Sequence, residues 1–296
     1  MKSRILWWVS GAGPLARLAG LSLTVFFIGG LFAASASAAP FVYVVTLSQQ
    51  FGTIDLANGK FQPIGNGTPD GLANLVWWHG SLRTLTTFPT PGSLAKINPA
   101  MGEEAVVGAT GLSFNAFDLA EVRGKLYLTD FSNNLYSVDP LTGIATTDVN
   151  TGLPPDPNIP FTFNDDGTFN LCDEGLYGIA GKLYATFDSY AIDPTQTPPT
   201  IVHEYVSPRV YEVDPFTGAT TVIAKTDWQL SAIVEADGKV YAFKAVIDGF
   251  DSSIDLPISH AELVTLDLKT GKTQKVADLD PGLGPIFGAV PVRRLR

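Results

Sequence analysis

Short runs in which apolar and polar residues alternate recur along this chain, and each run stops at turn-forming residues. The clearest pair is 125–130, which contains Leu126 and Leu128, and 134–139, which continues the alternation after a short polar joint. A period of two places successive side chains on opposite faces of a β-strand. The two runs therefore predict a β-hairpin with one face against a core.

The second recurring feature is an Asp/Asn-x-x-x-Gly turn. An Asp or Asn side chain accepts hydrogen bonds from downstream backbone amides, and Gly supplies the positive φ that closes such a turn. The signature occurs at 55–59, 98–102, 139–143, 214–218 and 267–271. These repeats predict five copies of one supersecondary unit.

The predicted strands between these turns follow a cycle of four. The unit that contains the hairpin has strands at 117–122, 125–130, 134–139 and 144–149, and further complete units begin at 72, 176 and 230. The segment 41–64 resembles the last three strands of a unit, whereas 285–292 resembles a first strand alone. Together the two ends complete a fifth unit.

This arrangement predicts an all-β fold, a five-bladed β-propeller closed by pairing the N-terminal strands with the C-terminal strand. Four-stranded repeats of roughly 40 residues or more are typical of propellers, and closing the ring removes exposed strand edges. An open sandwich and a six-bladed ring are the structural alternatives.

The repeats also resemble a known group of proteins. Gly-Lys-Leu-Tyr occurs at 124–127 and 181–184, and Leu/Val-Tyr-x-Val-Asp-Pro-x-Thr-Gly occurs at 135–143 and 210–218. In these motifs the chain is similar to bacterial extracytoplasmic propeller proteins of the broad YVTN/NHL-like type. The resemblance implies the propeller fold, but such proteins include binding scaffolds, lactonases and lyases, so it does not select a function.

The N-terminus has the pattern of a targeting segment. Basic residues within 1–17 precede an apolar run at 18–33, and Ala36 and Ala38 form a small-residue cleavage site. We expect a signal peptide at 1–38, followed by one propeller domain at 39–296 that is exported to the periplasm or the medium. A retained membrane anchor is the alternative; no later stretch is apolar enough to span a bilayer.

Composition narrows the classes of partner. Hydrophobic residues make up 45% of the chain and charged residues 16%, which suits a well-packed globular domain. The formal net charge of −10 repels phosphate backbones, so we expect no nucleic-acid partner. Cys172 is the single cysteine, so the fold does not depend on an internal disulfide. We expect a monomer stabilised by packing.

Three insertions interrupt the repeat spacing, at 151–171, 188–208 and 246–260. We expect them to be long loops on one end of the ring, opposite the Asp/Asn-x-x-x-Gly turns, and we place function there because loops of this length are usually functional or disordered. Their clustered carboxylates are candidate ligands for Ca²⁺, with solvated loop charge as the alternative: Asp165, Asp166, Asp248, Asp251 and Asp255.

The channel of the propeller is the second candidate site. First strands of blades line the axis, so Asp118, Asp173 and Glu174 are candidate catalytic carboxylates for hydrolysis, the alternative being that they cap backbone amides or bind channel water. Candidate ligand-binding residues combine strand-starting polar groups with aromatic residues of the insertions: Asp70, Gln229, Phe169, Tyr190 and Phe250. Packing against the ring is the alternative use of the aromatic residues.

Two histidines, His203 and His260, lie in different insertions, and their approach would give an imidazole pair for a transition metal, with surface hydrogen bonds as the alternative. No nucleophile elbow or phosphate-binding loop is present in the sequence. The leading hypothesis is a binding scaffold for a protein or carbohydrate. The alternatives are a hydrolase or lyase acting on a carbohydrate or lactone, with Ca²⁺ as a candidate cofactor, and a structural surface-layer protein.

Overall fold

The computed structural model of the chain describes residues 40–68, 71–88, 92–112, 116–130, 134–151, 153, 162–227, 229–253 and 256–293. The predicted signal peptide and the predicted site residues Asp70 and Asp255 lie outside these residues. The described part contains twenty β-strands and one short 3-10 helix, η1 (Pro281–Leu283). None of its helices is long and apolar enough to cross a membrane.

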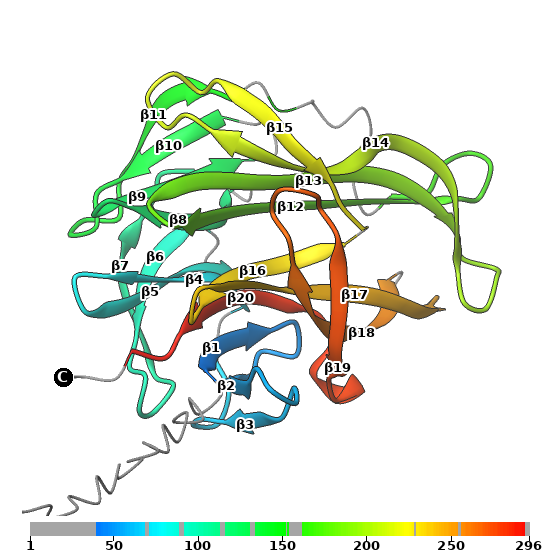
Figure 1. The fold of residues 1–296 in the computed structure, drawn as a ribbon, viewed down its shortest axis with the longest axis horizontal. Coiled ribbons are helices and arrows are strands. Elements are labelled where there is room, and N and C mark those ends of the chain that lie inside the picture. Colours follow the sequence, from blue (N-terminus) through cyan, green and yellow to red (C-terminus); the bar gives the residue numbers. More distant parts are fainter. Residues whose placement is uncertain are drawn as a thin grey trace, which may run out of the picture. The chain divides into compact units, whose positions relative to one another are not determined.

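The strands form five antiparallel sheets of four strands each, the blades of a five-bladed β-propeller (Figure 1). Blade 1 consists of β20 (Ile286–Pro291), β1 (Phe41–Thr46), β2 (Phe51–Asp55) and β3 (Phe61–Pro63). Blade 2 consists of β4 (Gly71–Trp78), β5 (Ser81–Phe88), β6 (Ser93–Ile97) and β7 (Glu104–Ala109).

The remaining three blades follow the same order from the inner to the outer strand. Blade 3 consists of β8 (Ala116–Val122), β9 (Lys125–Asp130), β10 (Asn134–Val138) and β11 (Ala145–Asn150). Blade 4 consists of β12 (Phe169–Ile179), β13 (Lys182–Asp193), β14 (Thr200–Val213) and β15 (Thr220–Lys225). Blade 5 consists of β16 (Leu230–Ala236), β17 (Lys239–Asp251), β18 (Leu256–Leu266) and β19 (Thr273–Asp278).

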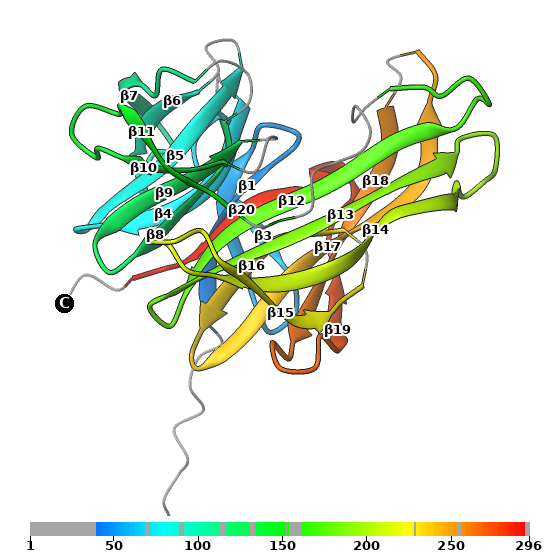
Figure 2. The same cartoon turned by 90° about the horizontal axis from the view of Figure 1, so that it is seen from above.

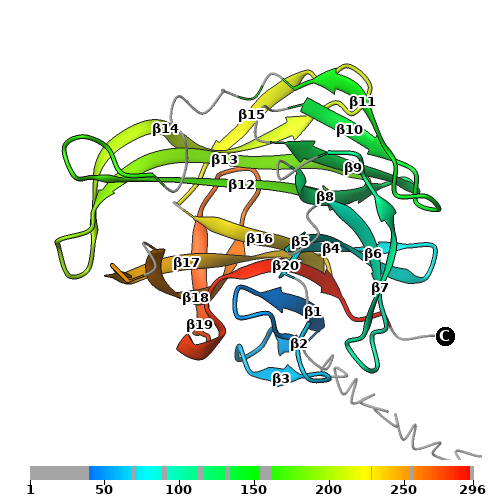
Figure 3. The same cartoon turned by 180° about the vertical axis from the view of Figure 1, so that it is seen from behind.

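Blade 1 joins the two ends of the domain, as the sequence predicts. Strand β1 pairs with β20, with Val44 opposite Ala289, and the amide of Val292 donates to the carbonyl of Phe41 at 2.8 Å. Figure 3 shows this pairing from behind. The innermost strands β20, β4, β8, β12 and β16 contact one another in that order around the axis, and β16 contacts β20 again. The predicted closed, five-bladed ring is therefore confirmed.

The core of the ring is divided into layers between neighbouring blades. Blades 5 and 1 bury Val44 against Phe243, and blades 2 and 3 bury Leu85 against Leu128. Similar clusters fill the other three boundaries between blades. Because successive side chains of the inner strands point alternately to the two neighbouring blades, these strands are buried on both faces, whereas the outermost strands are largely exposed.

The five predicted turns all have the expected geometry. In each turn the first side chain accepts a hydrogen bond from the amide two residues later, as Asp139 does from Leu141 at 2.8 Å and Asn98 does from Ala100 at 3.0 Å. The closing glycines have φ between 71° and 82°. At Gly143 an added Cβ would lie 2.4 Å from the carbonyl oxygen of Gly108, so this turn also packs closely against blade 2.

The prediction of long loops at 188–208 and 246–260 is wrong. Strand β13 continues to Asp193 and β14 begins at Thr200, whereas β17 continues to Asp251 and β18 begins at Leu256. The insertions are therefore outward extensions of the β13–β14 and β17–β18 hairpins (Figure 2). Cross-strand hydrogen bonds continue along both extensions, and a buried apolar cluster at Phe169, Leu171, Tyr190 and Ile192 covers one side of them.

Candidate functional site

Five of the thirteen large hydrophobic residues that are exposed in the described part lie on the two extended hairpins and on the segment that precedes β12. The exposed fraction is 48% for Phe163, 41% for Ile201, 45% for Val202 and 53% for Ile258. Tyr205, 37% exposed, lies on the same part of β14. We call these five residues the hairpin surface. They lie at the end of the ring where second strands join third strands, opposite the Asp/Asn-x-x-x-Gly turns.

An aromatic cluster of Phe163, Phe169 and Phe250 lies next to this surface. The ring centroids of Phe163 and Phe169 lie 5.0 Å apart, and those of Phe169 and Phe250 lie 5.1 Å apart, both edge to face. Phe169 comes from blade 4 and Phe250 from blade 5, so the cluster joins the two hairpins. Edge-to-face contacts of this kind add stability beyond simple burial.

The predicted aromatic ligand-binding residues differ in how far they are buried. Phe169 and Tyr190 are each 1% exposed, whereas Phe250 is half-buried. Tyr190 contacts the side-chain amide of Gln229, another predicted ligand-binding residue. The backbone amide of Gln229 donates to Asp188 at 3.2 Å. The structure thus brings Tyr190 and Gln229 together, but it places the tyrosine inside the protein and leaves Phe163 as the exposed aromatic side chain of the cluster.

The predicted calcium ligands engage in separate local interactions. Asp166 accepts from the hydroxyl of Thr168 at 2.6 Å and lies 3.4 Å from His203, and Asp251 accepts from the hydroxyl of Ser253 at 2.6 Å. These hydrogen bonds lower the pKa of both carboxyl groups. Asp165 is exposed.

The fourth described member of that set, Asp248, binds the imidazole of His260 at 2.8 Å. Each of the two histidines thus pairs with a carboxylate: His203 with Asp166 and His260 with Asp248. Within the described residues, one group of at least three potential ligand side chains converges within 4.8 Å, and it consists of His260, Glu262 and Asp278. It contains none of the predicted calcium ligands, whose binding of Ca²⁺ stays a prediction.

The predicted catalytic carboxylates lie on inner strands, as expected. Asp118 is on β8 and is 7% exposed, whereas Glu174 is half-buried on β12. Asp173 precedes it on β12, and its side chain is outside the described part. Neither Asp118 nor Glu174 lines the cavity on the propeller axis. A hydrolytic role for these residues therefore stays a prediction.

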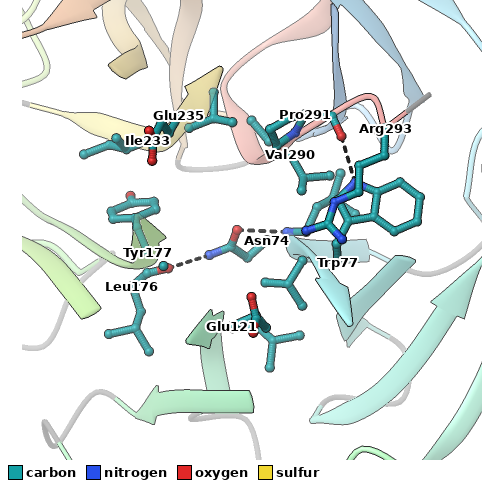
Figure 4. Close-up of a pocket in the computed structure, with 16 residues that line it drawn as sticks. Asn74, Trp77, Glu121, Leu176, Tyr177, Ile233, Glu235, Val290, Pro291 and Arg293 are labelled. Carbon is teal, nitrogen blue, oxygen red and sulfur yellow. Dashed lines mark hydrogen bonds between the residues drawn. The ribbon is translucent and has the colours of Figure 1, made fainter. Parts of the chain in front are cut away.

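The axial cavity has a volume of about 170 Å³ and lies toward the last residues of the inner strands. Asn74 reaches across it from β4: its Nδ2 donates to the carbonyl of Leu176 on β12 at 3.0 Å (Figure 4). Asn74 itself has φ 53° and is 4% exposed. Because β8 lies between β4 and β12 in the ring, this hydrogen bond spans the axis.

The carboxylates around the cavity cap nearby turns. Glu121 accepts from the amide of Gly124, and Glu235 accepts from the amide of Ala180 at 3.0 Å. Arg293 lies over the ring of Trp77, with 5.6 Å between the guanidinium carbon and the ring centroid. These contacts indicate a structural role for Asn74, Glu121, Glu235 and Arg293, since each of these side chains either binds a backbone group or stacks on an aromatic ring.

Sequence reasoning missed Asn74 and the exposed residues of β14. Asn74 falls within a strand whose pairing is irregular between Ala73 and Val76, and neither its positive φ nor its reach across the axis has a sequence motif. For β14, the β-branched and aromatic residues within 200–206 were a usable strand signal. The length of the insertion had instead favoured a loop.

Comparisons with known proteins add no functional assignment. No family model matches the sequence. No curated protein matches it either. One similar solved structure is a nidogen/laminin complex, 11% identical, covering 86% of this chain and 98% of that chain with a TM-score of 0.47. A protein of unknown function from Bacteroides thetaiotaomicron is 14% identical, with coverage of 80% and 55% and a TM-score of 0.44.

A third similar structure is the computationally designed Ika8 protein, 12% identical, with coverage of 84% and 61% and a TM-score of 0.32. Likenesses of this size carry no argument about activity or partners. The chain's own five sheets define its class: it is a five-bladed β-propeller. The predicted propeller is thus confirmed, whereas the bacterial YVTN/NHL-like repeat type stays a prediction.

Proposed function

We propose that this protein is an exported β-propeller that binds a partner protein through its hairpin surface, with the ring as the scaffold. The observation that carries the proposal is the set of exposed apolar side chains that the two hairpins and the adjoining segment before β12 hold at one end of the ring. Phe163, Ile201, Val202 and Ile258 are each more than two-fifths exposed. Apolar residues that gather on a surface, rather than occurring singly, are typical of interaction sites.

The backbone of β14 adds a second reason. Strand β15 pairs with Arg209–Val213, and no strand of the described part pairs with the same edge of β14 at residues 200–206. An unpaired edge presents amide and carbonyl groups that an extended segment of another protein can bind as an added strand. The partner favoured by this chemistry offers an extended, predominantly apolar segment.

Photocrosslinking in the native host tests this proposal. A photoreactive amino acid replaces Ile201 or Ile258 on the hairpins, and the same residue replaces Leu141 or Phe216 in matched controls. The controls are also exposed and apolar, with exposed fractions of 73% and 70%, but they lie in turns at the opposite end of the blades.

The expected result is one discrete protein adduct at the hairpin positions and none at the turn positions. Adducts at the turns alone, equal adducts at both ends, or no protein adduct at the hairpins would each contradict the proposal. Binding of oligosaccharides without a protein adduct would favour the carbohydrate alternative.

Export is part of the same proposal and has its own measurement. Mass spectrometry of the protein from the periplasm and medium should show a chain that begins at Ala39, because cleavage after Ala38 is expected. A full-length chain retained with the membranes would contradict export as a soluble protein.

A further inference from the structure

Three potential metal ligands meet on one face of blade 5. His260 and Glu262 are two residues apart on β18, so their side chains point to the same face. Asp278 lies directly opposite Glu262 on β19 and therefore shares that face. The ligand atoms of all three lie within 4.8 Å of one another, and His260 Nε2 is 3.9 Å from Asp278 Oδ1.

Asp248 orients the imidazole of this group. The pairing of β17 with β18 shifts register between Ile247 and Gly249, which leaves Asp248 unpaired in the ladder. Such a bulge re-aims a side chain, and Asp248 Oδ2 lies 2.8 Å from His260 Nδ1. A carboxylate oxygen can accept a hydrogen bond from Nδ1, and in the neutral tautomer that has its proton on Nδ1 the lone pair of Nε2 is available to a metal ion. Carboxylates commonly orient metal-binding histidines in this way.

A cation already bridges the two carboxylates. The ammonium of Lys275 lies 2.6 Å from Glu262 Oε1 and 2.6 Å from Asp278 Oδ1. Hydrogen bonds to Asp278 and then to Glu262 raise the pKa of Lys275. Its side chain is 48% exposed, so the ammonium can leave for solvent when another cation takes its place.

We propose that His260, Glu262 and Asp278 bind a divalent transition-metal ion, with Zn²⁺ as the representative ion, in competition with the ammonium of Lys275. One imidazole nitrogen and two carboxylate oxygens form a three-residue set that suits Zn²⁺ with water as a further ligand. Ca²⁺ requires six to eight oxygen ligands, so this site differs from the predicted calcium site. It does not depend on the proposed partner binding.

Isothermal titration calorimetry of the purified protein with ZnCl₂ at neutral pH tests the site. The wild type should bind one ion per chain at this site, and CaCl₂ at the same concentration should give no comparable binding. His260→Ala should weaken zinc binding by at least about tenfold, because even the loss of a residue that only supports a metal ligand lowers metal affinity by about that factor. Lys275→Met should strengthen it, because the competing ammonium is removed while the aliphatic stem is kept.

His203→Ala is the matched control. His203 also lies on an extended hairpin and contacts a carboxylate, Asp166 at 3.4 Å, but it is outside the group, so its replacement should leave zinc binding unchanged. The proposal is overturned if neither the wild type nor Lys275→Met binds zinc, or if His203→Ala weakens binding as much as His260→Ala does.

Circular dichroism without metal establishes that each variant is folded. If His260→Ala is not folded, Glu262→Gln decides the question, because it keeps the size of the side chain and removes a charged ligand. Glu262→Gln should weaken zinc binding while circular dichroism stays that of the wild type. A folded Glu262→Gln variant with wild-type zinc affinity would overturn the assignment of Glu262 as a ligand.

Discussion

Blades 3 and 4 are built on one plan and differ in the length of three strands. The first three strands of blade 3 contain 7, 6 and 5 residues, whereas those of blade 4 contain 11, 12 and 14. Both blades close with an Asp-Pro-x-Thr-Gly turn and bury an apolar layer against their neighbours. The common half of each blade therefore forms the ring, and the added half of blade 4 supplies a surface that the ring does not need for closure.

Blade 5 shows the same division within a single strand. Phe243 lies in the ring part of β17 and is 0% exposed, whereas Phe250 lies in the hairpin part and is half-buried. The same substitution, Phe→Ala, can therefore be made in both regions. It should give the largest difference in the free energy of unfolding between ring and hairpin.

Phe243→Ala should lower the free energy of unfolding by about 3–5 kcal/mol, the usual cost of a large cavity in a close-packed core. Phe250→Ala should cost about 1 kcal/mol, since the ring is only half-buried and its removal leaves a smaller cavity. Urea unfolding of both variants measures the difference. Equal losses would mean that the hairpin cluster is as essential to the fold as the ring.

Two glycines allow the packing of a ring turn to be compared with that of a turn next to the hairpins. Gly143 closes the blade 3 turn and Gly167 lies in the turn before β12, and both have φ 82°. An added Cβ at Gly143 would lie 2.4 Å from the carbonyl oxygen of Gly108, whereas nothing lies within 4 Å of one at Gly167.

Gly167→Ala should cost about 1 kcal/mol for the left-handed conformation alone. Gly143→Ala should cost at least about 1 kcal/mol more, because the ring must shift to relieve the clash. Thermal unfolding of the two variants, analysed side by side, measures the difference. A larger loss for Gly167→Ala would contradict the close packing of the blade 3 turn.

The smallest expected effect concerns acid stability of the ring turns. Hydrogen bonds to the amide of Leu141 and the side chain of Thr142 lower the pKa of Asp139 in the folded protein. The pKa values of Asp214 and Asp267 are lowered for similar reasons. Because the folded pKa lies below the unfolded one, this stabilisation is complete above about pH 4 and is lost as the pH falls through the folded pKa.

The combined variant Asp139→Asn, Asp214→Asn and Asp267→Asn should keep the turns and lose part of this acid sensitivity. Asn98 is the natural precedent, since its amide oxygen accepts from Ala100 at 3.0 Å in the same turn of blade 2. Thermal midpoints at neutral pH and at about pH 3 measure the effect. An unchanged difference between the two midpoints would contradict the role of these carboxylates.

The ring was predictable because its signals are local. Each turn is specified by a side chain such as Asp139, which bonds the amide two residues away, and by a glycine such as Gly143 with positive φ. The pairing of the two ends was predictable from the number of strands in each unit, since 41–64 lacks a first strand and 285–292 lacks the other three.

The cluster that supports the hairpins and the proposed zinc site were not predictable, because both depend on contacts between residues far apart in the sequence. The extension of β13 and β14 is supported by a cluster that joins Phe169 to Phe250 across two blades. The group at His260 depends on the register that places Glu262 opposite Asp278 and on the bulge at Asp248. A one-residue change in register would move a side chain to the other face of the sheet.

The central claim is that the hairpin surface, and not the turn face, binds a partner protein. Hydrogen exchange measured with and without the partner identified by crosslinking tests it most directly. The account predicts slower exchange of amides within 200–206, where an added strand would pair with β14, and unchanged exchange at the 214–218 turn. Protection at that turn, with unchanged exchange along 200–206, would contradict it.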